Sequence, residues 1–123
     1  APEFLTRLMW DKFSKKIKNE ILNKGKTIIK NGSYEYPITY QLIKDGRKNK
    51  VLNKIIYSKI NVTMIHGKED EVVPISSSRS VLSIFKKAKK KLVVVKNGDH
   101  SLSNSKHLKI LLRELKGVIK NFI

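Results

Sequence analysis

The stretch "INVTMIHGKEDEVVP", residues 60–74, decides the fold because it joins a short apolar run to an acidic loop. Its first six residues are rich in β-branched side chains and lead into a glycine-containing loop, which predicts a buried strand rather than a helix. The loop places Glu69, Asp70 and Glu71 in succession, although the chain has only 10 acidic residues against 27 basic ones. This local reversal of charge at the end of a predicted strand marks the loop as a candidate site.

The segment after the acidic loop repeats the same order of elements. Residues 76–88, "SSSRSVLSIFKKA", are predicted to form a helix that its first serines cap. Its expected inward-facing residues are Val81, Leu82, Phe85 and Ala88. Residues 92–96, "LVVVK", predict a second strand, covered on both faces because the β-branched run is continuous. The loop "NGDHSLSNS", residues 97–105, follows this strand.

The spacing of apolar residues predicts a final helix after the second loop. Apolar side chains recur at intervals of three and four, which is typical of a helix with one buried face. These residues are Leu108, Leu111, Leu112, Leu115, Val118 and Ile119. Strand, loop and helix, repeated once, predict half of a doubly wound α/β sheet, in which sites lie beyond the carboxyl ends of the strands. Both unusual loops fall at such ends.

The N-terminal residues show a helical pattern instead. Apolar residues at intervals of three and four predict an amphipathic helix or helix pair, with Ser14 as a cap and Gly25 as a stop. This stripe consists of Trp10, Phe13, Ile17 and Ile21. Residues 31–37, "NGSYEYP", are rich in turn formers and predict a connector. Residues 38–46, "ITYQLIKDG", predict a short helix that ends near Gly46.

Length and composition limit the class of protein. A chain of 123 residues with 40% hydrophobic residues indicates one small domain with a modest core. The absence of cysteine excludes disulfides, thiolate metal sites and a cysteine nucleophile. No apolar run approaches the roughly 18 residues of a membrane span, and the first ten residues lack the features of a signal peptide. We therefore expect a cytoplasmic protein without a transmembrane segment or a cofactor.

The net charge of +17 makes nucleic acid or an anionic membrane a candidate partner. Against this, 23 of the basic residues are Lys and only 4 are Arg, whereas bidentate recognition of phosphate and guanine favours Arg. The densest cluster, "KKAKKKL" at 86–92, has no interleaved glycine or aromatic residue of the RNA-recognition type. A small lysine-rich binding protein is therefore the weaker hypothesis, kept as the alternative to an enzyme.

The two loops predict one chemical constellation. Neighbouring parallel strands bring the loops at their carboxyl ends side by side, so we expect Asp70 and His100 within hydrogen-bond distance. The carboxylate would orient one imidazole nitrogen, while the other nitrogen handles the proton of a nucleophile or of water. The alternative for Asp70 is a carboxylate that only caps its loop. A metal site is not favoured because no typical ligand spacing is present. His66 is expected to satisfy its turn, and His107 to lie on the surface.

These loops resemble those of the α/β-hydrolase family. "HGKEDEVVP" is similar to the family's acid-bearing loop, commonly Gly-x-x-Asp-x-x-Val-Pro, and "NGDHSL" is similar to its histidine loop. "APEFLTRLMWDKFS" and "YPITYQLIKDGRKN" are similar to the segment between strands six and seven in the group of the acyl-glucuronide esterase and depalmitoylating thioesterase and its bacterial relatives. The resemblance implies the C-terminal part of an α/β-hydrolase fold, with Asp70 as the acid and His100 as the histidine of a catalytic triad.

The resemblance also implies an arrangement of the whole chain. Residues 1–123 would form a single partial α/β-hydrolase domain, with 1–59 as a lid-like helical segment and 60–123 carrying the acid and the histidine. Near the start, four residues would line an acyl-binding site: Phe4, Leu8, Met9 and Trp10. Without the resemblance, Trp10 is expected to be an ordinary packing residue, as are Phe13, Tyr34 and Tyr36.

One part of the family's machinery is missing from the sequence. The family's nucleophilic serine lies in a Gly-x-Ser-x-Gly motif, and this sequence contains none. We therefore predict a segment of a serine hydrolase of carboxylic esters or thioesters that has little activity alone. Its expected partner is an N-terminal hydrolase half or a second copy of the chain. A decayed gene product is the remaining alternative.

Overall fold

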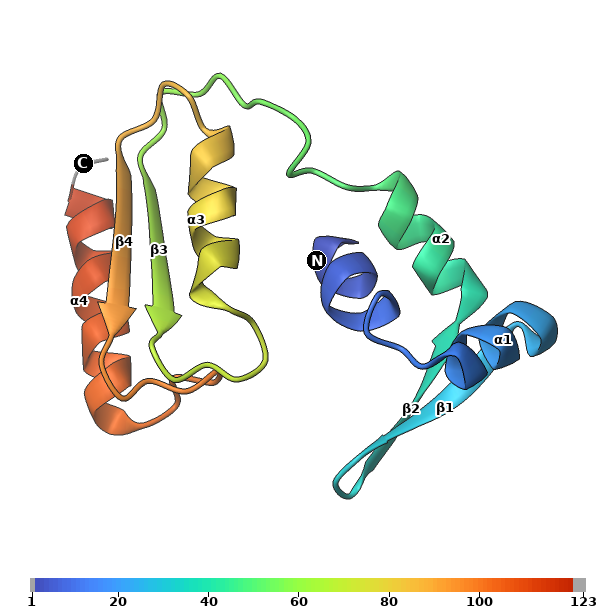
Figure 1. The fold of residues 1–123 in the computed structure, drawn as a ribbon. Coiled ribbons are helices and arrows are strands. Elements are labelled where there is room, and N and C mark those ends of the chain that lie inside the picture. Colours follow the sequence, from blue (N-terminus) through green and yellow to red (C-terminus); the bar gives the residue numbers. More distant parts are fainter. Residues whose placement is uncertain (1, 121–123) are drawn as a thin grey trace. The chain divides into compact units, whose positions relative to one another are not determined.

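The computed structural model describes residues 2–120. The chain divides into two compact units, 1–53 and 54–123. The boundary lies six residues before the one between the predicted segments 1–59 and 60–123. Figure 1 labels the elements of both units. Each unit is described by itself.

The first unit begins with two consecutive helices, the π-helix η1 (Phe4–Trp10) and α1 (Lys15–Lys24). The predicted cap and stop of α1 are confirmed. The Ser14 hydroxyl accepts a hydrogen bond from the Ile17 amide at 3.3 Å, and Gly25 ends the helix at φ = 76°. Glycine adopts this left-handed conformation without the steric cost of a side chain, so it ends helices readily.

A β-hairpin follows, formed by β1 (Lys26–Asn31) and β2 (Tyr34–Thr39) in antiparallel register. The prediction of a connector over 31–37 is therefore wrong. Pro37 argued against a strand because proline cannot donate to the ladder, but proline is tolerated at the edge of a sheet, and every strand of a two-stranded sheet has a free edge. Gly32 at φ = 61° makes the two-residue turn.

The hairpin leads directly into α2 (Tyr40–Lys48). Thr39 caps this helix, because its hydroxyl accepts a hydrogen bond from the Leu42 amide at 3.1 Å. The predicted helix over 38–46 is present, but it starts two residues later and continues past Gly46.

The core of the first unit is a cluster of three buried isoleucines. Ile21, Ile38 and Ile43 come from α1, β2 and α2, and none is more than 3% exposed. Half-buried residues pack against the cluster: Met9, Trp10, Phe13, Ile17, Ile29, Tyr36 and Tyr40. The predicted stripe of α1 is therefore a core stripe, and this unit encloses a core of its own.

The second unit contains the predicted strand, loop and helix repeat. Its strands β3 (Val62–Gly67) and β4 (Lys90–Val95) pair in parallel, and α4 (Ser105–Lys120) ends the described chain. His66 contacts α3 (Ile75–Ile84), whereas its neighbour Ile65 lines a groove with α4. Because successive side chains of a strand point to opposite faces, the two helices cover opposite faces of the strand pair, as Figure 1 shows.

The helix α3 differs from its prediction at both ends. It starts at Ile75, after Pro74, and no serine side chain caps it. It ends at Ile84, so Phe85 and Ala88 lie beyond the helix and are not among its inward-facing residues. Val81 and Leu82 are half-buried, and Ile84 is buried.

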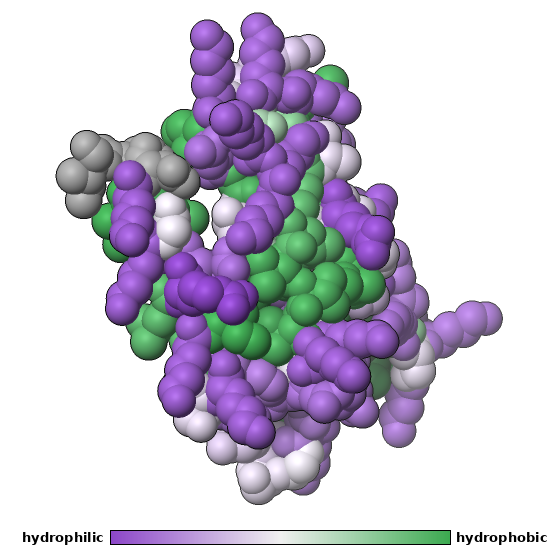
Figure 2. All heavy atoms as spheres, turned by 90° about the vertical axis from the view of Figure 1, so that its left-hand side faces the viewer, coloured by the Kyte–Doolittle hydropathy of each residue, from purple (hydrophilic) through white to green (hydrophobic). Residues whose placement is uncertain are grey.

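The helix α4 is present, but of its predicted inward face only Leu111 and Val118 are turned away from solvent. The residues turned away from solvent are His107, Ile110, Leu111, Glu114 and Val118. Four apolar residues are 45 to 56% exposed, namely Leu108, Leu112, Leu115 and Ile119. Figure 2 views this side of the molecule and shows hydrophobic residues gathered between hydrophilic margins. The second unit therefore leaves much of its apolar surface uncovered.

Candidate active site

The acidic loop after β3 is fastened by the carboxylate of Asp70. One oxygen, Oδ1, accepts hydrogen bonds from the amides of Val72 and Val73, both at 2.9 Å. The side chain of Asp70 is only 7% exposed. The carboxylate therefore caps its own loop, as the alternative for Asp70 predicted, and its second oxygen remains available for another hydrogen bond.

That second oxygen, Oδ2, lies 2.9 Å from Nδ1 of His100. The structure thus brings together the two residues that the sequence predicted to meet, 30 positions apart in the chain. An ionised carboxylate only accepts hydrogen bonds, so Nδ1 of His100 donates and Nε2 carries the lone pair. The imidazole is 57% exposed. The arrangement can therefore hold a histidine in one tautomer and offer its second nitrogen to a proton.

The pKa of Asp70 lies below its ordinary value of 3.8. Burial alone would raise it, because removal from water disfavours the charged form. The hydrogen bond from the Val73 amide, the one from His100 and the one from the Val72 amide outweigh burial, and the charge of His100 adds to them. Asp70 is therefore kept ionised, which is the state needed to orient an imidazole.

Two glycines allow the acidic loop and the histidine loop to touch. A Cβ added to Gly67 would lie 2.3 Å from the carbonyl oxygens of Gly98 and Asp99, and a Cβ added to Gly98 would lie 3.0 Å from Cα of Gly67. The close approach is held by hydrogen bonds from the Lys68 amide to the Val95 carbonyl, at 2.9 Å, and from the Glu69 amide to the Gly98 carbonyl, at 2.8 Å. This contact of backbones sets the separation of Asp70 and His100.

The histidine loop is shaped by its own side chains. Asn97 and Leu102 adopt positive φ angles of 57° and 49°, a conformation that costs a bulky residue such as leucine about 1 kcal/mol or more. Asp99 offsets this cost, since its carboxylate accepts hydrogen bonds from the Leu102 amide at 2.8 Å and the Ser101 hydroxyl at 2.9 Å. These bonds, that of Ser101 first, also lower the pKa of Asp99. Leu102 is buried, so the loop is anchored on both sides of His100.

His66 is buried beneath the acidic loop and confirms the prediction that it satisfies the turn. Its Nε2 lies 3.0 Å from the carbonyl oxygen of Val73, and its Nδ1 lies 2.7 Å from the hydroxyl of Ser78. A carbonyl only accepts, so Nε2 donates to Val73 and Nδ1 accepts from Ser78. This role of Ser78 was not predicted from the sequence, in which Ser78 was expected to lie at the start of the helix.

These contacts also link a serine, a histidine and a carboxylate, namely Ser78, His66 and Asp70. Nε2 of His66 lies 3.5 Å from Oδ2 of Asp70. Ser78 is 4% exposed and His66 is 6% exposed, so no substrate carbonyl can reach the hydroxyl. This group therefore braces the acidic loop and does not supply a nucleophile.

The residues predicted to line an acyl site all lie in the first unit, on η1. Phe4, Leu8, Met9 and Trp10 are half-buried. Met9 and Trp10 pack against the isoleucine core, and the guanidinium of Arg47 lies 5.0 Å from the centre of the Trp10 ring. The packing expected of Trp10 is thus present, and the lining role of all four residues stays a prediction.

The position of His107 contradicts the prediction made from the sequence. It is buried at 7% exposure rather than lying on the surface, and its Nδ1 has no hydrogen-bond partner among residues 2–120. The reason is the start of α4, where the side chain of Asn104 accepts hydrogen bonds from the amides of Lys106, at 2.9 Å, and His107, at 3.2 Å. This cap fixes the helical register, and the register turns position 107 inward.

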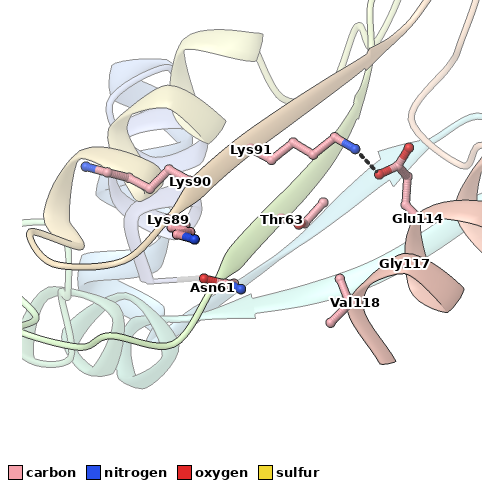
Figure 3. Close-up of a pocket in the computed structure, with 8 residues that line it drawn as sticks. All are labelled: Asn61, Thr63, Lys89, Lys90, Lys91, Glu114, Gly117 and Val118. Atoms are coloured by element: carbon pink, nitrogen blue, oxygen red, sulfur yellow. Dashed lines mark hydrogen bonds and ion pairs between the residues drawn. The ribbon is translucent and has the colours of Figure 1, made fainter. Parts of the chain in front are cut away.

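Part of the dense lysine cluster lies beside a hollow of the second unit. A hollow of about 260 Å³ is lined by Lys89, Lys90 and Lys91 together with Asn61, Thr63, Glu114, Gly117 and Val118. Figure 3 shows Lys90 extending away from the hollow, while Lys91 reaches Glu114 at 2.5 Å. The carboxylate thus neutralises a lysine there. Within residues 2–120, no three His, Asp or Glu side chains are grouped to hold a metal ion, and no helix is long and apolar enough to cross a bilayer.

Comparisons with solved structures identify the fold. A protein from Agrobacterium vitis S4 that is classed as a hydrolase is 22% identical, with a TM-score of 0.87 over 97% of this chain and 46% of its own. Alpha/beta hydrolase domain-containing protein 10 from mouse is also 22% identical, with a TM-score of 0.82 over 100% of this chain and 50% of its own. The esterase domain of a Rhodothermus marinus protein is 19% identical, with a TM-score of 0.51 over 68% and 34%.

No protein-family model and no curated protein sequence matches the chain. The likeness to solved structures therefore carries the assignment, and it establishes that the chain has the fold of the C-terminal part of an α/β-hydrolase. The predicted fold class is confirmed. The chain spans about half the length of the first two structures that it resembles.

Proposed function

We propose that this chain supplies the acid and the histidine of a serine hydrolase, and that the nucleophilic serine comes from a segment outside the chain. The observation that carries the proposal is the contact of 2.9 Å between Oδ2 of a buried, ionised Asp70 and Nδ1 of an exposed His100. A carboxylate that only capped its loop would not need an exposed imidazole as a partner. The fold of the chain is that of a hydrolase part, which adds support.

The chemistry follows from the tautomer of His100. Its Nε2 would accept the hydroxyl proton of a serine as that oxygen attacks a carbonyl, and would then return the proton to the leaving group. Asp70 would stabilise the imidazolium that forms between the two steps, because its carboxylate stays charged and keeps its hydrogen bond. Asp70 orients the ring and does not itself take the proton.

The substrate class proposed is a carboxylic ester or thioester, as the resemblance of the two loops to α/β-hydrolases implies. In both compounds the serine oxygen adds to the carbonyl carbon, and the alcohol or thiol leaves with the proton that His100 returns. The acyl group then passes from serine to water by the same route. The half-buried residues of η1 are the proposed acyl-binding surface.

The test restores a serine to the chain. The part of the Agrobacterium vitis protein that the structural match leaves uncovered is fused ahead of residue 1, and the fusion is treated with a fluorophosphonate that labels activated serines. We expect labelling of a serine in the added part, and loss of at least about 1000-fold in labelling rate in His100→Asn and Asp70→Asn, as removal of a triad member predicts.

Glu71→Gln is the matched control, since Glu71 is exposed in the same loop as Asp70. It should leave the labelling rate of the fusion unchanged. Labelling that persists in His100→Asn would overturn the proposal, as would labelling of a serine in this chain without the added part.

A further inference from the structure

The backbone of Val73 joins the carboxylate of Asp70 to the imidazole of His66. The Val73 amide donates a hydrogen bond to Oδ1 of Asp70 at 2.9 Å, and the Val73 carbonyl accepts one from Nε2 of His66 at 3.0 Å. Val73 also precedes Pro74, and a residue before proline has few backbone conformations available. A shift of its carbonyl therefore moves its amide as well, so His66 holds the backbone that aims the carboxylate.

The same nitrogen of His66 faces the carboxylate oxygen that His100 uses. Nε2 of His66 lies 3.5 Å from Oδ2 of Asp70, whereas Nδ1 of His100 lies 2.9 Å from it. The longer distance is outside the usual range of a hydrogen bond, so His66 does not replace His100 as the partner. The side chains of His66 and Asp70 are 6% and 7% exposed, so water screens the attraction between the N–H group and Oδ2 only weakly. His66 thus restrains Oδ2 and leaves its bond to His100 intact.

Ser78 decides which nitrogen of His66 carries the proton. Its hydroxyl lies 2.7 Å from Nδ1 and donates to it, which leaves the proton on Nε2. In the opposite tautomer the lone pair of Nε2 would face two acceptors, the Val73 carbonyl and the Asp70 carboxylate, and would repel both. A buried hydroxyl of α3 therefore fixes the state in which His66 attracts the carboxylate.

From these contacts we infer that His66 is a positioning residue for the acid of the site. In the tautomer that Ser78 fixes, it keeps Oδ2 of Asp70 directed at Nδ1 of His100. The inference rests on the proposed function, because Asp70 and His100 are the groups whose geometry His66 maintains. The competing explanation is that His66 only fills space beneath the acidic loop. That explanation gives no role to the nitrogen that faces Oδ2.

The tautomer of His100 tests the inference in the chain alone. Nitrogen-15 resonances of the imidazoles distinguish the two neutral tautomers at about pH 8, where histidine side chains are ordinarily neutral. In the unaltered chain we expect the proton of His100 on Nδ1, because Asp70 accepts it. His66→Phe keeps a planar ring but removes both nitrogens, and it should shift His100 toward the Nε2–H tautomer. An unchanged tautomer of His100 in His66→Phe would overturn the inference.

Two further variants separate positioning from packing. His66→Gln retains a side-chain N–H donor and an oxygen acceptor, so it should keep the proton of His100 mainly on Nδ1. Ile84→Ala truncates a side chain of α3 that is 7% exposed. It should lower the urea midpoint of the second unit and leave the tautomer of His100 unchanged. Equal tautomer shifts in His66→Phe and Ile84→Ala would mean that the tautomer reports only stability, and would overturn the inference.

Ser78→Ala provides a milder variant that keeps the imidazole and tests the inference even where His66→Phe does not fold. The loss of the hydroxyl frees the tautomer of His66, so His100 should shift in the same direction as in His66→Phe, but less. Combining the two changes should give the shift of His66→Phe alone, because Ser78 acts through His66. A tautomer of His100 that is unchanged in Ser78→Ala would overturn the inference.

Fluorophosphonate labelling of the fusion keeps the two proposals apart. His66→Phe should lower the labelling rate by up to about 100-fold, as a small displacement of a catalytic group predicts, and His66→Gln should recover most of it. A tautomer shift in the chain alone, with no labelling of the unaltered fusion, would support the inference and overturn the proposed function. Labelling of the fusion, with no tautomer shift in His66→Phe, would support the function and overturn the inference.

Discussion

The two units of this chain bury their apolar residues in different ways. The first unit, without any proposed catalytic group of the triad, closes a core of Ile21, Ile38 and Ile43. The second unit holds Asp70 and His100, and its buried apolar residues are Ile84, Val95 and Leu102, while four apolar residues of α4 remain about half exposed. The first unit thus has a closed hydrophobic core, whereas the second unit leaves part of its apolar surface exposed to solvent.

The incomplete core does not loosen the candidate site. The loops around Asp70 and His100 are tied by backbone hydrogen bonds, by the contact of Gly67 with Gly98 and by the buried pair of His66 and Ser78. These contacts are local to the carboxyl ends of β3 and β4 and do not involve the exposed apolar residues of α4. The contacts that order the two loops are therefore separate from the burial of the apolar face of α4, and each can be changed without the other.

The largest expected effect falls on the finished core. Ile21→Ala should lower the free energy of unfolding of the first unit by about 2 to 5 kcal/mol, because it removes buried methyl and methylene groups and leaves a cavity. Urea unfolding followed by the fluorescence of Trp10, the sole tryptophan, measures this change. Leu22→Ala alters the next residue of α1, which is 49% exposed, and should change stability by less than about 0.5 kcal/mol. Equal losses would contradict a closed core.

The next effect concerns the contact between the loops. Gly67→Ala should destabilise the second unit by up to about 3 kcal/mol, because the new methyl group would meet the carbonyl oxygens of Gly98 and Asp99 at 2.3 Å. The loops must then separate, so the nuclear Overhauser contact between the His100 ring and the Asp70 methylene should disappear. Gly117→Ala is the control: a Cβ there meets nothing within 4 Å, and alanine favours a helix by about 0.5 to 1 kcal/mol. Retention of the Overhauser contact in Gly67→Ala would refute the role given to this glycine.

A smaller effect tests the brace under the acidic loop. Ser78→Ala leaves Nδ1 of the buried His66 without a donor, which should cost about 1 to 3 kcal/mol. The amides of Val72 and Val73 donate hydrogen bonds to Asp70. Faster hydrogen exchange of these amides in Ser78→Ala would show that the pair of His66 and Ser78 holds the loop. Ser83→Ala serves as the control, since Ser83 is exposed on the same helix. Equal exchange rates in the two variants would mean that the hydrogen bond of Ser78 to His66 does not hold the acidic loop.

Features that depend on local pattern or on topology could be predicted from the sequence. The β-branched runs gave the two parallel strands, and the meeting of Asp70 with His100 follows because neighbouring parallel strands end at the same edge. The cap of α1 at Ser14 and its end at Gly25 are equally local.

Features that depend on tertiary contacts could not be predicted in this way. His107 is buried because the Asn104 cap fixes the register of α4, and a one-residue shift would have turned it outward. The pairing of His66 with Ser78 joins a strand to a helix 12 residues away and leaves no periodic signal. The close approach of Gly67 and Gly98 requires the distance between two backbones. The hairpin of β1 and β2 was hidden by Pro37, whose position at a sheet edge only the pairing reveals.

The smallest expected effect concerns the charge of Asp70 and appears as a dependence on pH. The folded state keeps the pKa of this carboxyl below its ordinary value of 3.8, so the folded protein favours the ionised form more than the unfolded chain does. Its contribution to stability is therefore present in full above the unfolded pKa and is lost as the pH falls through the folded pKa. Asp70→Asn removes the ionisation, and because His100 is exposed the loss at pH 7 should be about 1 kcal/mol or less. Urea midpoints of the two proteins should differ most near neutral pH and converge in acid, whereas Glu71→Gln should follow the unaltered protein throughout. A difference that stayed constant down to acid pH would mean that the ionisation of Asp70 contributes nothing, and that its carboxylate serves the loop only through neutral hydrogen bonds.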